Sequence, residues 1–356
     1  MDLNEYKRII RLTLKSTYPQ YLLPGFFKLL EKKGLIKYDG RKKDIPNVVS
    51  IANEISDERK IDVLMDQIAS IVREYEEYEY IRGYRYSYLF NITDFNLNSF
   101  HEELKKSELR KIDDESDSSD ELKSALYSPT YYENEEKIYF KFNLRIFNKI
   151  DGVKSIKYPV LAIIHKDYGL IEIRQDVIPI EYKNQQKFYE FNARAVQTFI
   201  QNKFKIHLVN VDLQAVIRYM NNKKKEEVKV TAMRLKRDGM DAYLDSSEND
   251  KMKLPFIDEL KDMLKEGIFN SSLKEVSLIK ERLEEFIREV EENSNLPTAR
   301  IFWIDNKYRV LARGQEVEGE LVYIKWIQGL KGEEDMDYVA RYINKCEREL
   351  EKELSD

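Results

Sequence analysis

A triplet of residues that could hold a catalytic metal ion lies in the segment GLIEIRQDVIPIEYKNQQKF, residues 169–188. Glu181 and Lys183 stand two positions apart at the end of an apolar run, so on a strand both side chains would lie on one face. Carboxylates bind Mg²⁺, and a lysine beside them can orient the water that attacks a phosphodiester. Asp167 or Asp176 would have to supply the second carboxylate. The triplet therefore predicts a magnesium site, with Glu181 and Lys183 catalytic and with metal ligands drawn from Asp167, Asp176 and Glu181.

This spacing resembles the E-x-K element of restriction-endonuclease-like nucleases, in which a further acidic residue lies on the preceding strand. Two features weaken the resemblance. In one regular strand Asp176 would point to the face opposite Glu181, so Pro179 would have to mark a bulge or bend. E-x-K is also frequent by chance in a chain of which 35% of the residues are charged. The alternative interpretation, a solvated strand end, is the one that the sequence favours.

A second candidate combines aromatic and basic residues in YEYIRGYRYSYLF, where tyrosines alternate with Arg82 and Arg85. Aromatic rings can stack on exposed bases while arginine neutralises phosphate, and together they can bind single-stranded nucleic acid. Basic positions of two later strands could extend this surface. The predicted nucleic-acid-binding residues are Arg82, Tyr84, Arg85, Tyr86, Lys141, Arg145, Lys229, Arg234, Lys236 and Arg237. The alternative is a tyrosine-rich strand packed on one side, with its arginines paired to the glutamates at 74–79.

Composition excludes several other classes of protein. Lys and Arg total 60 against 65 Asp and Glu, so binding of nucleic acid by bulk attraction is excluded and any such binding must be local. The single cysteine, Cys346, excludes an internal disulfide framework and fits a reducing compartment, and three scattered histidines predict no Cys/His zinc site. The start of the chain lacks an uninterrupted apolar segment, and no stretch is long and apolar enough for a membrane span. We therefore expect a cytoplasmic protein without a membrane partner, and no cofactor unless Mg²⁺ serves the nuclease alternative.

The spacing of apolar residues divides the chain into parts. Between residues 4 and 82 it is helical, and Gly34 and Pro46 serve as stop and start signals. The stretch IDDESDSSDE at 112–121 has almost no apolar content, which predicts a flexible acidic linker. We therefore expect a helical domain at 1–111 and a linker at 112–135.

After the linker the period changes to two. In KIYFKFNLRIF the apolar positions from Ile138 to Ile146 alternate with polar ones, which indicates a half-buried strand with a basic outer face. Strands and helices then alternate, and a strand pair should turn at Asp305–Lys307. The fold class predicted is α+β: a small helical N-terminal unit followed by a mixed sheet-and-helix body. That body could be two related α+β modules, at 136–268 and 269–356.

Three functions follow from these patterns. The favoured one is a non-enzymatic nucleic-acid-binding or assembly subunit of a complex, for which a protein partner is expected. The alternatives are a magnesium-dependent restriction-endonuclease-like nuclease built on Glu181 and Lys183, and a protein-interaction adaptor that binds no nucleic acid. Abundant Lys, Glu, Ile, Asn and Tyr is typical of AT-rich bacterial or phage genomes, where the first two functions would suit defence against phage or mobile elements.

Overall fold

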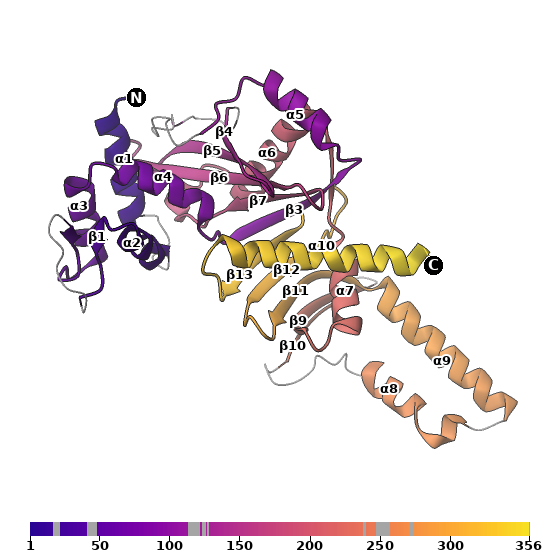
Figure 1. Cartoon of the computed structure of the whole chain (residues 1–356). Helices are drawn as coiled ribbons and strands as arrows, with labels where there is room; N and C mark the ends of the chain where they lie inside the picture. The colour runs from indigo at the N-terminus through magenta and orange to yellow at the C-terminus, as the bar shows by residue number, and fades with distance from the viewer. Residues whose placement is uncertain are drawn as a thin grey trace. The chain divides into compact units, whose positions relative to one another are not determined.

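The computed structural model describes residues 1–16, 22–40, 48–112, 122, 126, 128–237, 240–246, 257–270 and 273–355. Within these residues the chain forms ten α-helices and thirteen strands, and nearly all strand pairs are antiparallel (Figure 1). The predicted α+β class and the helical N-terminal unit are confirmed. The chain divides into two compact units: unit 1 comprises Met1–Val211 and Leu330–Asn344, and unit 2 comprises Asp212–Gly329 and Lys345–Asp356.

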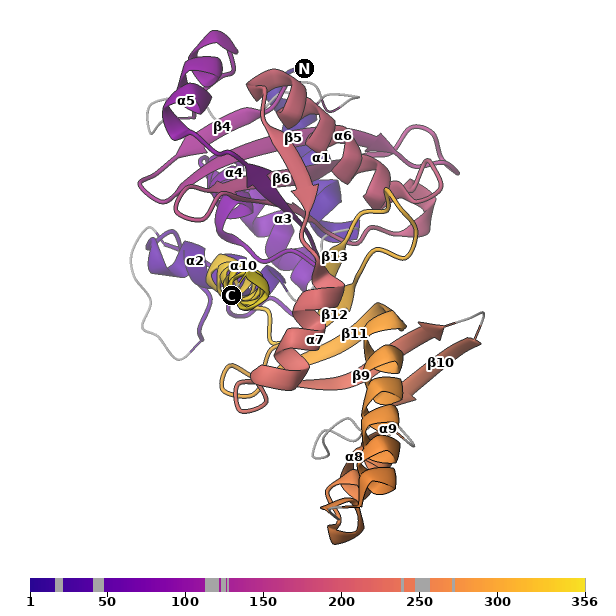
Figure 2. The same cartoon turned by 90° about the vertical axis from the view of Figure 1, so that its right-hand side faces the viewer.

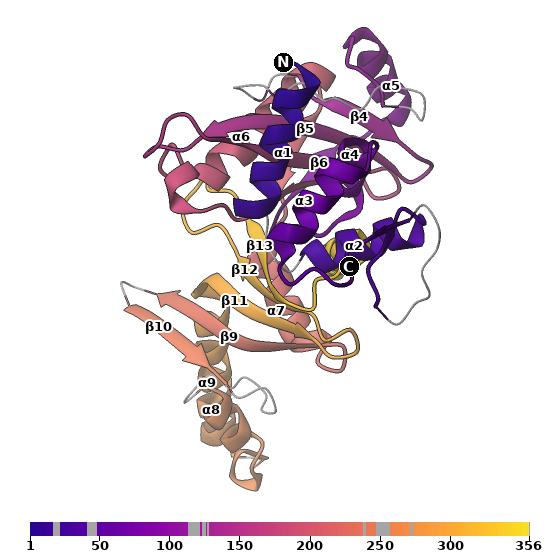
Figure 3. The same ribbon diagram turned by 90° about the vertical axis from the view of Figure 1, so that its left-hand side faces the viewer.

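Unit 1 is built around an antiparallel sheet in the order β8-β3-β7-β6-β5-β4. Its strands are β3 (Tyr86–Thr93), β4 (Thr130–Glu133), β5 (Lys137–Phe147), β6 (Ser155–His165), β7 (Leu170–Gln175) and β8 (His207–Asn210). Strands β5 and β6 pair along their whole length, from Lys137 beside His165 to Phe147 beside Ser155. Both strands are buried on both faces, because helices cover the sheet on each side (Figures 1 and 3). The predicted basic outer face of β5 is therefore wrong.

The two faces of this sheet have different chemistry. One is apolar: Phe140 and Phe142 of β5 contact aromatic rings of helices α5 (Leu97–Lys106) and α6 (Phe188–Phe204). The other carries lysines, glutamate and arginine, and it is covered by α1 and α4 of the N-terminal unit and by the first half of α10 (Glu333–Ser355). Charged side chains on a covered face must find partners on the covering helices.

The N-terminal helical unit has a core of its own. It contains α1 (Leu3–Ser16), α2 (Leu23–Lys32), α3 (Asp57–Gln67), α4 (Ile71–Ile81) and the short parallel pair β1 (Ile36–Lys37) and β2 (Val49–Ser50). Ser56 accepts a hydrogen bond from the Arg59 N–H and so caps α3. Gly34, with φ of 74°, follows α2 in the left-handed conformation that ends many helices. Phe26, Phe27 and other apolar side chains pack between the helices.

Unit 2 contains a second antiparallel sheet, in the order β10-β9-β11-β12-β13. Its strands are β9 (Val228–Arg237), β10 (Met240–Asp245), β11 (Asn295–Trp303), β12 (Arg309–Arg313) and β13 (Tyr323–Gln328), and its helices are α7 (Leu213–Lys223), α8 (Ile257–Leu264), α9 (Lys274–Asn293) and the end of α10. Two short 3-10 turns complete the described elements, η2 (Ile180–Tyr182) in unit 1 and η3 (Gly267–Asn270) in unit 2. The predicted turn between β11 and β12 is confirmed, with Lys307 at φ of 56°.

One face of the unit 2 sheet is packed and the other is open. Ile301, Trp303, Val310 and Trp326 are buried on the packed face, toward α7. Figure 3 shows β9, β10 and β11 with α7, α8 and α9 behind them and no helix of unit 2 in front. Most residues of the other face alternate with the buried ones and are half-exposed or exposed. We call this surface the open face.

The compact units differ from the predicted domain boundaries. The N-terminal helices belong to the same unit as the first sheet because buried ion pairs of α4 join it to β5 and β6. The predicted boundary at 268/269 separates β9 from β11, which pair along their length. Strand β4 lies within the predicted linker, whose acidic core at 113–121 is outside the described residues. None of the described helices has the length and apolar character needed to cross a membrane.

Candidate nucleic-acid interface

The tyrosine and arginine stretch predicted as a stacking platform is largely buried at the junction of α4 and β3. Arg82 is 2% exposed and forms an ion pair with Asp176, which follows β7. The Tyr84 ring centre lies 3.8 Å from the Arg82 guanidinium, and the Tyr84 hydroxyl donates a hydrogen bond to the Glu79 carbonyl. Burial raises the pKa of Tyr84. Arg82 and Tyr84 hold the protein interior together here, so their assignment to a binding surface is wrong.

Three other predicted residues of unit 1 also have intramolecular contacts. The Arg85 N–H donates to the Asp176 carboxylate, and the Tyr86 ring stacks on Tyr189 with centroids 4.8 Å apart. Arg145 pairs with Glu5 of α1 at 2.7 Å. All three side chains are half-buried.

Lys141 belongs to a buried group of four charges that we call the lysine–glutamate quartet. Its amino group lies 2.5 Å from Glu76 and 3.4 Å from Glu79, both on α4. Lys157 of β6 contacts the same two carboxylates, and all four side chains are nearly inaccessible. Burial disfavours the Glu79 carboxylate, but Lys157 and Lys141 outweigh that effect and lower the pKa of Glu79. The prediction that Lys141 binds nucleic acid is therefore wrong, because its charge is balanced inside the protein.

The Glu181-x-Lys183 triplet does not lie on a strand. Strand β7 ends at Gln175, and the triplet falls in and directly after the 3-10 turn η2. Alternation of side chains between two faces applies to strands, so Glu181 and Lys183 do not acquire the shared face that the nuclease hypothesis requires. Lys183 instead lies with its amino group 4.9 Å from the Tyr189 ring centre.

The two carboxylates proposed to join Glu181 are also placed elsewhere. Asp176 is buried in its ion pair with Arg82, and Asp167 is exposed in the turn between β6 and β7. Among the described residues, Glu181 belongs to no group of three ligand atoms close enough to share a metal ion. The metal site predicted from Asp167, Asp176 and Glu181 is therefore not formed.

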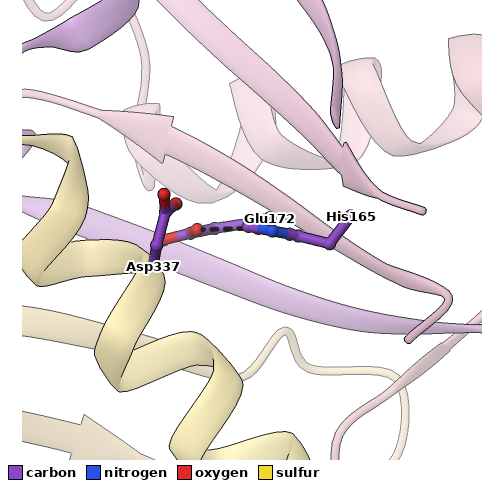
Figure 4. Close-up of side chains that lie close together, drawn as sticks. All are labelled: His165, Glu172 and Asp337. Atoms are coloured by element: carbon purple, nitrogen blue, oxygen red, sulfur yellow. Dashed lines mark hydrogen bonds and ion pairs between the residues drawn. The ribbon is translucent and has the colours of Figure 1, made fainter. Parts of the chain in front are cut away.

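A different group has metal-ligand geometry, and sequence reasoning missed it. His165 of β6, Glu172 of β7 and Asp337 of α10 place one ligand atom each within 4.8 Å of one another (Figure 4). Arg174, however, donates from one nitrogen to both carboxylates at 2.6 Å, and Lys137 also pairs with Asp337. Burial would raise the pKa of Glu172, but the Arg174 guanidinium outweighs it and lowers that pKa to about 2. Arg174 and Lys137 already balance the two carboxylates. The group therefore holds α10 on the sheet, and no unbalanced negative charge is left to attract a metal ion.

The open face of unit 2 collects basic side chains from four strands. Residues that face each other across antiparallel strands point to the same side of the sheet. The register places Arg234 and Arg313 on either side of Thr298, and Arg309 beside Phe302. The basic residues of the open face are Lys229, Arg234, Lys236, Arg300, Arg309, Arg313 and Lys325, all half-exposed.

Carboxylates lie among these cations and balance part of their charge. Arg234 donates to Asp241 at 2.8 Å, Arg300 lies 3.3 Å from Asp245, and Lys236 pairs with Glu316. Glu320 lies close enough to influence the Arg313 guanidinium. The described part of the open face therefore holds seven cations with at least four carboxylates beside them, in a chain whose formal charge is -5.

Aromatic rings lie among these cations. The Arg309 guanidinium is 5.5 Å from the centre of the Phe302 ring. Tyr243 is 57% exposed, and its hydroxyl accepts a hydrogen bond from Arg300 at 3.2 Å. Tyr323 of β13 pairs with Arg313 across the strands. Charged and aromatic groups thus alternate over a half-exposed surface, as the sequence predicted for a different part of the chain.

The sequence located part of this surface. Lys229, Arg234 and Lys236 were predicted to bind nucleic acid and lie on the open face, whereas the side chain of Arg237 is outside the described residues. The cations of β11, β12 and β13 were missed. Their signal was the same alternation, visible in ARIFWIDNKYRVLAR, where Arg300, Phe302 and Arg309 fall on one side of the hairpin.

Comparison with known proteins adds no assignment: no family model matches this sequence, and the curated proteins include no significant match to it.

Proposed function

We propose that the protein binds single-stranded nucleic acid, without cleaving it, through the open face of unit 2. The observation that carries the proposal is the concentration of seven basic side chains on one face of a sheet in a chain of net negative charge. Phosphate contacts by Lys and Arg supply most of the sequence-independent affinity of such proteins.

The aromatic residues favour single strands over duplex. Bases of a single strand can unstack and lie on aromatic side chains, whereas a duplex hides the faces of its bases. Phe302 and Tyr323 are half-exposed beside Arg309 and Arg313, so a base and its phosphate could be bound together. The sheet would then act as a platform that tolerates many sequences.

Fluorescence anisotropy with labelled 20-nucleotide dT and U oligomers tests the proposal. Phe302→Ala should weaken binding by about fivefold or more, since stacking contributes about 1–3 kcal/mol per base. Phe286→Ala is the matched control, because Phe286 is an exposed phenylalanine of α9, 48% exposed and away from the open face.

Two outcomes would contradict the proposal. One is equal binding by the wild type and by folded Phe302→Ala. The other is failure of the wild type to bind any oligomer at low salt, which would favour the adaptor alternative.

A further inference from the structure

A cavity of about 460 Å³ lies on the packed side of unit 2, bounded by α7, α8, α9 and the strands β9, β10 and β11. Figure 2 shows α7 and α9 on the viewer's side of these strands. The volume falls within the range of about 300–1,000 Å³ that is usual for small-molecule sites in proteins.

The floor of the cavity is apolar and comes from alternating residues of two strands. Met233 and Leu235 of β9 pair with Leu244 and Ala242 of β10, and all four line the cavity. Their neighbours in sequence, including Arg234, point to the open face. The cavity and the open face are therefore opposite sides of the same strands.

The polar residues of the cavity are basic or amide in character. Arg218, Asn221 and Asn222 of α7 and Arg288 of α9 line it, and no carboxylate residue does so among the described residues. Arg218 donates to the Ser294 carbonyl, which fixes its side chain beside the cavity. Arg288 is exposed on α9. A cavity with an apolar floor and a cationic and amide lining complements a molecule with an apolar body and an anionic head group.

We propose that this cavity binds a small anionic amphiphile, of the chemical class of medium-chain fatty acids. The apolar chain contacts the β9 and β10 side chains, where burial of apolar surface contributes most of the affinity. The carboxylate is held by Arg288 and the asparagine amides, since a charged head group requires a charged or hydrogen-bonding partner at the cavity. This inference is independent of nucleic-acid binding.

Isothermal titration of the full-length protein with dodecanoate tests the proposal, with dodecyltrimethylammonium as the probe of opposite charge. Saturable binding of dodecanoate is expected, and binding of the cationic probe should be at least about tenfold weaker. Arg288→Glu should weaken dodecanoate binding about tenfold or more. Ala242→Trp should abolish it, because the indole fills the cavity from an exposed position on the edge strand.

Arg282→Glu is the matched control, because Arg282 is exposed on the same helix but does not line the cavity. It should bind dodecanoate like the wild type. Three results would overturn the proposal. The wild type could fail to bind dodecanoate saturably, or it could bind the cationic probe as tightly as dodecanoate. The third result is wild-type affinity for dodecanoate in the folded Arg288→Glu and Ala242→Trp variants.

Discussion

Replacing Lys157 with Met should lower the free energy of unfolding by about 3–5 kcal/mol, the usual cost of leaving a buried charge without its partner. In the lysine–glutamate quartet two lysines balance Glu76 and Glu79, and each of the four residues is 3% exposed or less. Methionine keeps the apolar stem but removes the charge, so Lys141 is the one lysine left in contact with both carboxylates of the quartet. The measurement is urea unfolding of the full-length protein, followed by far-ultraviolet circular dichroism.

Arg73→Met is the matched control on the same helix. Arg73 pairs with Glu77 at 2.9 Å, but both side chains are more than 40% exposed, so its loss should cost only about 0.2–1 kcal/mol. Adding Glu79→Leu to Lys157→Met removes one charge of each sign, so the double variant should be more stable than the sum of the single losses implies. A loss below about 1 kcal/mol for Lys157→Met, equal to that of the control, would refute the reasoning.

Three further predictions concern other parts of the chain. The pKa of Glu172, lowered to about 2, lies below the ordinary glutamate value of about 4.3. The ionised Glu172 therefore stabilises the folded protein by at most about 3 kcal/mol above pH ~4.3, and this stabilisation is lost as the pH falls toward 2. Glu172→Gln should flatten the acid dependence of Tm, and an unchanged profile would contradict this. Gly329 has φ of 89°, and a Cβ added there would lie 2.9 Å from the Lys307 carbonyl oxygen. Gly329→Ala should therefore lower the free energy of unfolding by about 1–3 kcal/mol, and by more than the control Gly319→Ala, where φ is 83° and no atom lies within 4 Å of the added Cβ. Equal shifts of Tm for the two variants would argue against the clash. Glu181→Gln should leave oligonucleotide binding unchanged with or without Mg²⁺ in anisotropy titrations, and a metal-dependent loss would revive the nuclease alternative.

The local sequence pattern predicted the strands and turns of this fold better than the long-range contacts of their side chains. The period of two around Phe140 and Phe142, and the turn before Arg309, are confirmed because both depend on neighbouring residues alone. The burial of Lys141 could not be read in this way, since a lysine alternating with apolar residues looks like the solvent side of a strand. Its partner Glu76 is 65 positions away and reaches it only when α4 packs on the sheet.

The accessibility of the candidate residues depends on contacts that are distant in sequence. Arg82 lies in a basic stretch whose sequence predicts exposure. In the structure it is buried, because it forms an ion pair with Asp176, 94 positions away. The cations of β9 lie on a face that no described helix of unit 2 covers, and they stay half-exposed. Local sequence gives the side of a strand on which a residue lies, and the covering helix decides whether that side is accessible.

The salt dependence of oligonucleotide binding tests the central claim most directly. The double variant Lys229→Ala/Lys325→Ala removes two cations of the open face. The slope of the logarithm of the binding constant against the logarithm of the salt concentration should become less steep by about 1.4, which is about 0.7 for each phosphate that the protein no longer neutralises. The control Lys105→Ala/Lys149→Ala removes the same charge from exposed positions of unit 1 and should keep the wild-type slope. Equal slopes for both double variants would contradict binding through the open face of unit 2.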